Sequence, residues 1–448
     1  MTPQETLDID RRTYLKMASG AVTIPALSSA VGATQDEEAE AGQSSSQSRH
    51  TKLDRLDAYL DENDLEAVWF ADSDTYAWLL GRSNVIDRSS STGVAVVGYD
   101  GADFTIVVDN DERALVRDEH FENRGADGDS SENGESGTDA ESTAETETDE
   151  ESAAGNSSPL PDVTIETFPW YATSLGEAVA VHSPTPAAAD FDVPGLESVS
   201  ASALRRPLTQ EDIDRYRTLS SQTAAAVEGV MRNAESGDTE QQVANALGCA
   251  LDEYGIDHPV VLVAGGERAP KYRHPVPRDT ELGDFVVVSV VGRRLGEYAS
   301  CTRTVAFDPP EWLEDRHRIA TRVDATALGA TQAAAQSDET AGDVFEAIRA
   351  AYEQAGLPDE WQAHHQGGAA GYASREWVAK PDLETSVTAP MAYAWNPTVQ
   401  GAKSEGTVLV TADNIEPLTV TDDWPMLDAE SYVSDVTVSR PDVLYKNS

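Results

Sequence analysis

Residues 125–158 cannot take part in a hydrophobic core, and they therefore limit how the rest of the chain can fold. This segment contains eleven acidic residues, no basic residue and no aliphatic side chain larger than Ala. A segment with so little apolar surface cannot offset the entropy cost of becoming ordered. We expect a solvated, disordered insertion, so the folded parts must form from the residues before and after it.

The residues on both sides of this insertion predict a small α/β domain over residues 51–205. A helical face begins near Lys52, and three apolar runs at 67–70, 93–97 and 104–108 are typical of strands. Asp100-Gly101 suits a tight hairpin between the last two runs. Residues 163–170 and 178–181 complete the domain. Residues 34–50 carry no large apolar side chain, and we expect them to form a disordered tether.

Residues 206–445 predict a second, larger domain. Thr209 and Asp212 have the spacing of a capping box, and a second helix starts at Thr239. The segment 285–291 is nearly continuous in β-branched residues and predicts a buried strand. A further helix is expected over about 341–355, with Gly356 ending it.

The charge of the chain indicates a protein adapted to high salt. Its 32 Lys and Arg residues against 80 Asp and Glu residues give a formal net charge of −48. Such a charge repels itself in dilute buffer, and molar salt shortens the screening length to roughly 3 Å. With 40% hydrophobic residues, we favour a folded halophilic protein over an acidic nucleic-acid mimic or a disordered acidic protein. Nucleic-acid binding is disfavoured because no basic patch neutralises phosphates.

The N-terminus predicts export. The segment Asp10-Arg11-Arg12-Thr13-Tyr14-Leu15-Lys16 resembles a twin-arginine motif, and a short apolar run and a small-residue site near Ala33 follow. The apolar run is too short and too weakly apolar for a stable membrane span. We therefore expect residues 1–33 to be a signal peptide and the mature chain to be secreted or at the cell surface, without a transmembrane segment. A cytoplasmic helix that carries Arg-Arg by chance is the alternative. Asn156 lies in a glycosylation sequon, which is a weak pattern.

Two segments near the C-terminus carry a resemblance to a known family: Ala394-Trp395-Asn396-Pro397 and Gly401-Ala402-Lys403-Ser404-Glu405-Gly406-Thr407-Val408-Leu409-Val410. They resemble the last two active-site strands of the creatinase, prolidase and aminopeptidase P family. The resemblance covers most of residues 52–440 apart from the insertion. It implies an α+β fold, with a small creatinase-type α/β domain followed by a pita-bread domain of helices against a curved antiparallel sheet.

The resemblance also implies that most of the metal ligands of this family are missing. Active members bind two divalent metal ions with two Asp, one His and two Glu. Only Glu405 is kept, and the other four positions fall on Ser289, Ser300, Gly368 and Asn396. Neutral side chains of these types cannot supply the anionic and imidazole donors that such a site requires. We therefore predict a divergent member with no bound metal and no cofactor.

Other polar residues remain at positions that the resemblance assigns to the active site. His364 lies four residues before the metal-binding position, His274 lies near a loop that presents a substrate-facing His, and creatinase is itself a metal-free member that uses a His as proton carrier. We predict His364, His274 and Glu405 as catalytic residues, and Arg375, Asn396 and Tyr272 as substrate-binding residues. The structural alternatives are that His364 and His365 stitch a loop, that Glu405 pairs with Lys403 or Arg303, and that Asn396 satisfies a strand end.

These features predict metal-independent hydrolysis of a small substrate with a polar C–N bond, since a histidine can carry a proton near neutral pH. An Xaa-Pro peptidase is a competing enzyme interpretation, which the ligand losses disfavour. A binding protein that kept the cleft and lost the chemistry is the rival from another class. The expected partner is a small molecule or a short peptide, and the resemblance implies a possible homodimer.

Overall fold

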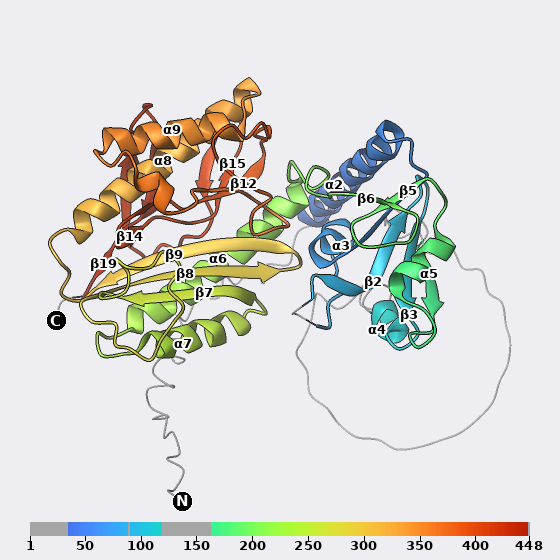
Figure 1. Cartoon of the computed structure of the whole chain (residues 1–448), viewed down its shortest axis with the longest axis horizontal. Coiled ribbons are helices and arrows are strands. Elements are labelled where there is room, and N and C mark those ends of the chain that lie inside the picture. The colour runs from blue at the N-terminus through green and yellow to red at the C-terminus, as the bar shows by residue number, and fades with distance from the viewer. Residues whose placement is uncertain (1–34, 88–89, 119–162, 447–448) are drawn as a thin grey trace, which may run out of the picture. The chain divides into compact units, whose positions relative to one another are not determined.

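The computed structural model describes residues 35–87, 90–118 and 163–446, which form two compact units (Figure 1). One unit comprises residues 56–76 and 80–199, and the other comprises residues 77–79, the residues from 200 onward and the chain before residue 56. The predicted signal peptide, the acidic insertion and Asn156 lie outside the described residues.

The smaller unit is built on a six-stranded mixed sheet in the order β4-β3-β2-β1-β5-β6. Its strands are β1 (Ala67–Asp72), β2 (Thr92–Tyr99), β3 (Phe104–Asp109), β4 (Val163–Phe168), β5 (Ala187–Ala189) and β6 (Glu197–Ser198). Strands β2 and β3 form the predicted antiparallel hairpin, and Gly101 in its turn has a φ of 89° that favours glycine. The short helices are α3 (Ser73–Leu80), α4 (Arg113–Arg117) and α5 (Leu175–His182).

The larger unit contains two main sheets. The four-stranded sheet has the order β19-β9-β8-β7, with β7 (Asp257–Gly265), β8 (Phe285–Arg294), β9 (Glu297–Ala306) and β19 (Leu444–Tyr445). The five-stranded sheet has the order β11-β10-β12-β15-β16, with β10 (Gly367–Ala370), β11 (Trp377–Val378), β12 (Met391–Trp395), β15 (Val408–Val410) and β16 (Ile415–Pro417). Two small hairpins pair β13 (Thr398–Val399) with β14 (Ala402–Lys403), and β17 (Met426–Glu430) with β18 (Thr437–Pro441).

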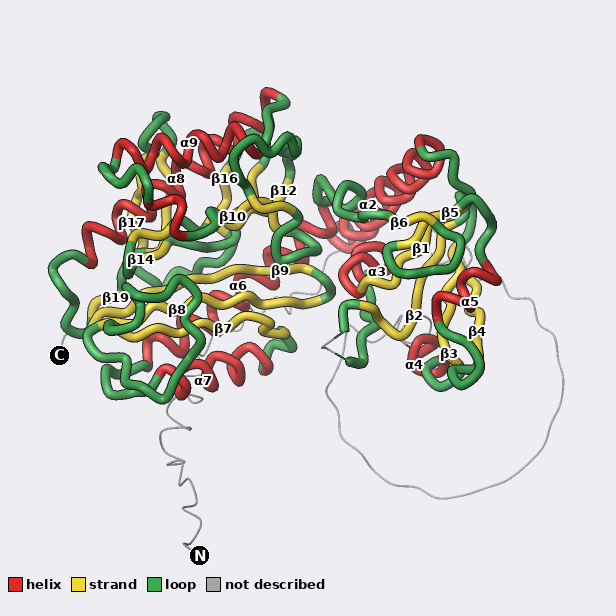
Figure 2. Tube along the Cα trace, in the orientation of Figure 1, coloured by secondary structure: helices red, strands yellow, loops and turns green. Residues whose placement is uncertain are grey.

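Helices cover the outer faces of these sheets. Helices α6 (Gln210–Asn233) and α7 (Glu240–Asp252) run along β7, β8 and β9, as Figure 2 shows in red beside yellow. Helix α8 (Leu313–Ser337) packs against β12, β14 and β17, and α9 (Ala341–Gln354) packs against α8. The apolar core between α6, α7 and the four-stranded sheet includes Val227, Leu247, Val263, Val288 and Val305. Helices packed on largely antiparallel sheets agree with the predicted α+β class.

Local sequence signals explain where the helices begin. Thr209 caps α6 in a full capping box with Asp212, as predicted, and Thr239 caps α7 in the same way with Gln242. Helix α9 begins at Ala341 and is followed by Gly356 at a φ of 77°. These three predictions are confirmed.

Helix α2 (Gln35–Glu62) departs from the sequence-based expectation. It begins at Gln35, whereas residues 34–50 were expected to form a disordered tether and the helix to start near Lys52. The prediction is wrong over this helix because Glu, Gln and Ala favour helix without offering any apolar surface to detect. Ser48 in this stretch is buried, and its hydroxyl accepts a hydrogen bond from the Glu211 amide. Within the described residues, none of the helices combines the length and the apolar character needed to cross a bilayer.

Candidate active site

Strands β8 and β9 bring three hydroxyl side chains to one buried surface. Ser289 lies opposite Thr302 in the sheet register, and their hydroxyl oxygens are 2.7 Å apart. Ser300, two residues earlier on β9, donates its amide to the Thr407 hydroxyl at 2.8 Å. This bond and the bridge between Cys301 and Gly406 join β9 to the segment that carries Glu405. Ser289 and Ser300 therefore lie beside Glu405, as the resemblance predicts.

The Glu405 carboxylate is fully engaged by neighbouring side chains. Its Oε1 atom lies 2.9 Å from Nη2 of Arg375, and its Oε2 atom lies 2.8 Å from Nζ of Lys403. The Thr302 hydroxyl donates a third bond to Oε2 at 2.9 Å. Only 5% of Glu405 is exposed. Arg375 also donates to the Ser300 hydroxyl at 3.2 Å, so a single network joins these residues.

This network keeps Glu405 ionised. Burial would raise its pKa, but the charges of Lys403 and Arg375 outweigh burial and lower the pKa to about 2. Each oxygen of this carboxylate is held by a cation, so its charge is neutralised before the cationic end of a substrate could reach it. The geometry therefore favours the structural alternative for Glu405, with Lys403 as partner. Arg303, the other partner considered, pairs instead with Glu228 at 2.5 Å.

The residues present do not fit the dinuclear metal centre of the resembling family. At Gly368, a Cβ atom would lie 2.1 Å from the Trp377 carbonyl oxygen and 2.9 Å from its ring, so no side chain can stand there without a backbone shift. Ser289 and Ser300 offer only neutral hydroxyls, which are weak donors for a divalent ion. Glu405 already pairs with two cations, and their positive charge disfavours a divalent ion at its carboxylate. The hydrolysis proposed for this protein therefore does not use such a centre.

Asn396 follows strand β12 and is 2% exposed. Its amide nitrogen donates to the Gln366 carbonyl at 3.0 Å, and its side-chain Oδ1 has no hydrogen-bond partner among the described residues. The backbone amide of Asn396 therefore makes the hydrogen bond at the end of the strand, and the side chain is not needed for it. The role of Asn396 in binding substrate stays a prediction.

Three histidines converge next to this network. Nε2 of His364 lies 3.0 Å from Nε2 of His274, and the ring of His365 stacks on both. His364 is buried directly after the 3-10 helix η2 (Glu360–Ala363), and His274 comes from the loop between β7 and β8. The structure thus brings together the two histidines that were predicted as catalytic, and it adds His365.

All three imidazoles are held in the neutral form at neutral pH. Burial and the charge of Lys403 lower the pKa of His364 to about 3. Burial and the charge of Arg375 lower the pKa of His365 to about 4, and burial with Lys403 also lowers the pKa of His274. The negative charge of Glu405 raises the pKa of each ring, but by less than burial and the positive charges lower it.

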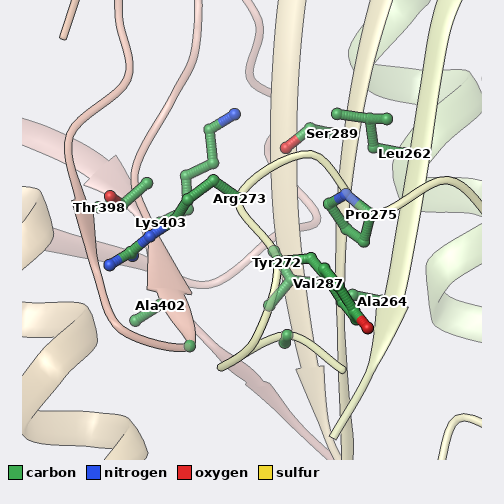
Figure 3. A pocket seen from close by; sticks show the side chains of 12 residues that line it. Leu262, Ala264, Tyr272, Arg273, Pro275, Val287, Ser289, Thr398, Ala402 and Lys403 are labelled. Carbon is green, nitrogen blue, oxygen red and sulfur yellow. The ribbon is translucent and has the colours of Figure 1, made fainter. Parts of the chain in front are cut away.

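A small pocket opens between Ser289, Thr398 and Lys403 (Figure 3), and none of the three histidines is among its lining residues. Ser289, Lys403, Tyr272 and the neighbours of His274 in sequence, Arg273 and Pro275, are among the residues that line it. Its cavity volume is about 30 Å³, which is room for about one water molecule, so a substrate would have to widen the pocket on binding. Tyr272 is half exposed and stacks on Arg268, with 5.2 Å between the guanidinium carbon and the ring centre. Tyr272 thus lies at the pocket, and its role in binding substrate stays a prediction.

Sequence reasoning missed the central place of Lys403 and the part played by His365 and Trp377. Lys403 was considered only as an ion-pair partner, although it is one of six lysines in the chain. Because lysine is so rare in this protein, its presence in the segment 401–410 could have indicated that Lys403 belongs to the site. Trp377 gave no signal, because its contact with Gly368 depends on the pairing of β10 with β11.

The two sheet layers, with polar residues gathered on inner strands, define a pita-bread domain of the metallopeptidase type. Residues 214–412 match the profile of metallopeptidase family M24. Glu405 and the four altered ligand positions all lie inside this range. The C-terminal domain therefore resembles family M24 over this range, and the predicted relation to creatinase, prolidase and aminopeptidase P is confirmed. No curated protein matches the chain.

Solved structures with the same fold extend over almost the whole chain. The Xaa-Pro dipeptidase from Bacillus anthracis has a TM-score of 0.63 at 14% identity, covering 89% of this chain and 100% of its own. The prolidase from Pyrococcus furiosus has a TM-score of 0.60 at 18% identity, covering 82% and 99%. The N-terminal domain of the FACT complex subunit SPT16 from Cicer arietinum has a TM-score of 0.57 at 11% identity, covering 84% and 96%. The predicted fold is confirmed.

Proposed function

We propose that the protein is a hydrolase that cleaves a C–N bond of a small substrate without the dinuclear metal centre of its family. The observation that carries this proposal is the 3.0 Å contact between Nε2 of His364 and Nε2 of His274, next to the pocket. Two neutral imidazoles in contact can share one proton. Acid–base catalysis requires such a group that can accept a proton and donate it again.

In this proposal, the histidine pair moves one proton from water to the leaving nitrogen. An imidazole nitrogen of His274 accepts a proton as the water oxygen bonds to the substrate carbon. The pair holds this proton and delivers it to the nitrogen as the C–N bond breaks. The lowered pKa values leave both rings unprotonated at neutral pH, and they also make each ring a weaker base than a free imidazole, so the proton is held only briefly. Lys403 lines the pocket and provides positive charge where negative charge develops on the substrate oxygen.

The charges at the pocket favour an anionic or amphoteric substrate. Arg273 and Lys403 line it, and no carboxylate is among the described residues that do so. The neighbouring network of Arg375, Lys403 and Glu405 carries two positive charges and one negative charge. A short peptide or another small substrate with a free carboxylate fits this pattern.

The test is turnover in molar salt with a chelator present, on guanidino substrates and on Xaa-Pro dipeptides. His364→Ala should lower turnover by about 10²–10⁴-fold while substrate affinity changes little. His182→Ala, on α5 of the other unit, is the matched control and should behave as the unchanged protein. Turnover that His364→Ala leaves intact would overturn the proposed role of the pair.

A binding protein without catalysis is the second candidate. The closed ion-pair network around Glu405 supports it, because that network removes the acidic group that a hydrolase of this family would use. The similarity to the SPT16 domain of the FACT complex also supports it, since this fold is found there in a subunit of a complex. Saturable ligand binding without turnover on any substrate would favour this candidate.

We also propose that the protein is exported through the twin-arginine pathway, that it works in high salt, and that it forms a homodimer. Arg11 and Arg12 support export, and the net charge of −48 supports adaptation to salt. Replacing both arginines with Lys should retain the precursor inside the cell, and equal secretion would contradict the assignment. Light scattering in molar salt measures the oligomeric state.

A further inference from the structure

His274, His364 and His365 bring three ligand atoms to one place from two segments of the chain. One ring nitrogen of each histidine lies within 4.8 Å of those of the other two. Around a tetrahedral zinc ion with Zn–N bonds near 2.1 Å, ligand nitrogens are roughly 3.4 Å apart. The 3.0 Å separation of His274 and His364 is close to this value. His274 and His365 keep exposed surface, so small rotations of their side chains can adjust the third ligand.

We infer that these three histidines form a mononuclear site for a transition metal ion such as zinc, with a fourth position open to water. The site is separate from the residues of the M24 dinuclear centre, none of which is one of these histidines. It also goes beyond the proposed function, which needs no metal.

The chemistry of the three rings sets which ions can bind. Neutral imidazoles suit Zn²⁺, Cu²⁺, Ni²⁺ and Co²⁺, whereas Mg²⁺ and Ca²⁺ require oxygen ligands. The positive charges of Lys403 and Arg375 oppose a cation, and Glu405 offsets only one of them. We therefore expect selective binding of imidazole-preferring ions with moderate affinity.

Metal binding and proton transfer would use the same atoms. A metal on Nε2 of His364 occupies the lone pair that the proposed proton carrier needs. Zinc should therefore inhibit the hydrolysis described above. Inhibition by zinc supports both proposals, whereas activation by zinc would support the metal site and overturn the metal-independent mechanism.

The test is a zinc titration of the chelator-treated full chain by calorimetry in molar salt. We expect one zinc ion per chain, and we expect His274→Ala and His365→Ala each to weaken binding by more than about tenfold. Both residues keep exposed surface, so the variants should fold, which circular dichroism checks. His182→Ala is the matched control and should leave binding unchanged.

A second measurement identifies the ligands. Cobalt in place of zinc should give the intense visible absorption of a four-coordinate site, and His365→Ala should reduce it. Magnesium should not compete. Absence of zinc binding at millimolar concentration would overturn the inference. So would two ions per chain, or binding that Glu405→Gln abolishes and the histidine variants leave unchanged.

Discussion

Glu405 is a retained family residue whose neighbours give it a different role. In its buried position, Arg375 and Lys403 each take one carboxylate oxygen. The ionised form is stable there only because both cations are present. The residue therefore holds the inner strands together, and the nearby histidines are left as the groups that can exchange a proton.

Glu405→Gln should destabilise the protein, because it leaves two buried cations without their shared anion. We expect a loss of about 3 kcal/mol in the free energy of unfolding. Denaturant unfolding in high salt measures it. Glu416→Gln is the control, because Glu416 pairs with Arg217 in a more exposed setting and should lose less than about 1 kcal/mol. Equal losses in the two variants would contradict the structural role of Glu405.

His364 predicts a specific pH dependence of stability. Its pKa falls from 6.5 to about 3 on folding, so the unfolded chain binds more protons between these values. Its contribution to stability is complete above the unfolded pKa and is lost as pH falls toward the folded pKa. His364→Gln should therefore lose less stability than the unchanged protein when the pH falls from about 7.5 to about 5. Thermal unfolding at both pH values measures the difference, and equal losses would count against the lowered pKa.

At the scale of elements, the local signals were the reliable ones. The capping boxes of α6 and α7, the glycine after α9 and the β2–β3 hairpin could be predicted because each is encoded within a few residues. Helix α2 began earlier than expected, since its first part has no apolar face to reveal it. Helix α8 was not singled out at all, because its alanine-rich sequence has weak contrast between its faces.

The candidate site, too, could be predicted only in part. The resemblance located Ser289, Ser300 and Glu405, which the structure brings together. The Arg375–Glu405–Lys403 network could not be predicted, because it depends on how β9, β14 and the loop after β10 meet in space. The convergence of His274 with His364 was expected only loosely, since 90 residues separate them.

Strand β10 provides a test of why the family metal centre is lost. Gly368→His restores the family ligand type, and Gly368→Ala adds only a methyl group. Both should destabilise the protein by roughly 1–3 kcal/mol, because any Cβ meets the Trp377 carbonyl. Gly229→Ala is the control within α6, where a Cβ meets open space, and it should be neutral or stabilising by up to about 1 kcal/mol. Tight metal binding by a stable Gly368→His variant would contradict the conclusion that Trp377 excludes a side chain at this position.

At the scale of the whole molecule, the charge of −48 is the dominant feature. We expect it to make folding dependent on salt, because self-repulsion grows as screening weakens. Stability measurements on this protein are therefore meaningful only at a stated, high ionic strength. Dilution into low salt should lower the unfolding midpoint.

The acidic insertion should contribute charge but no packing. Deletion of residues 125–158 removes no apolar side chain larger than Ala, so the free energy of unfolding in molar salt should change by less than about 1 kcal/mol. Limited proteolysis of the full chain should cut first within this segment. A large loss of stability on deletion would show that the segment docks on a folded domain.

We propose that this protein hydrolyses its substrate without the dinuclear metal centre of family M24. The most direct measurement is turnover on guanidino substrates and Xaa-Pro dipeptides in molar salt after exhaustive chelation, with metal content determined on the same sample. We predict that turnover on a C–N substrate persists with no stoichiometric metal and falls in His364→Ala. Two metal ions per chain, together with peptidase activity that chelation abolishes, would contradict the claim.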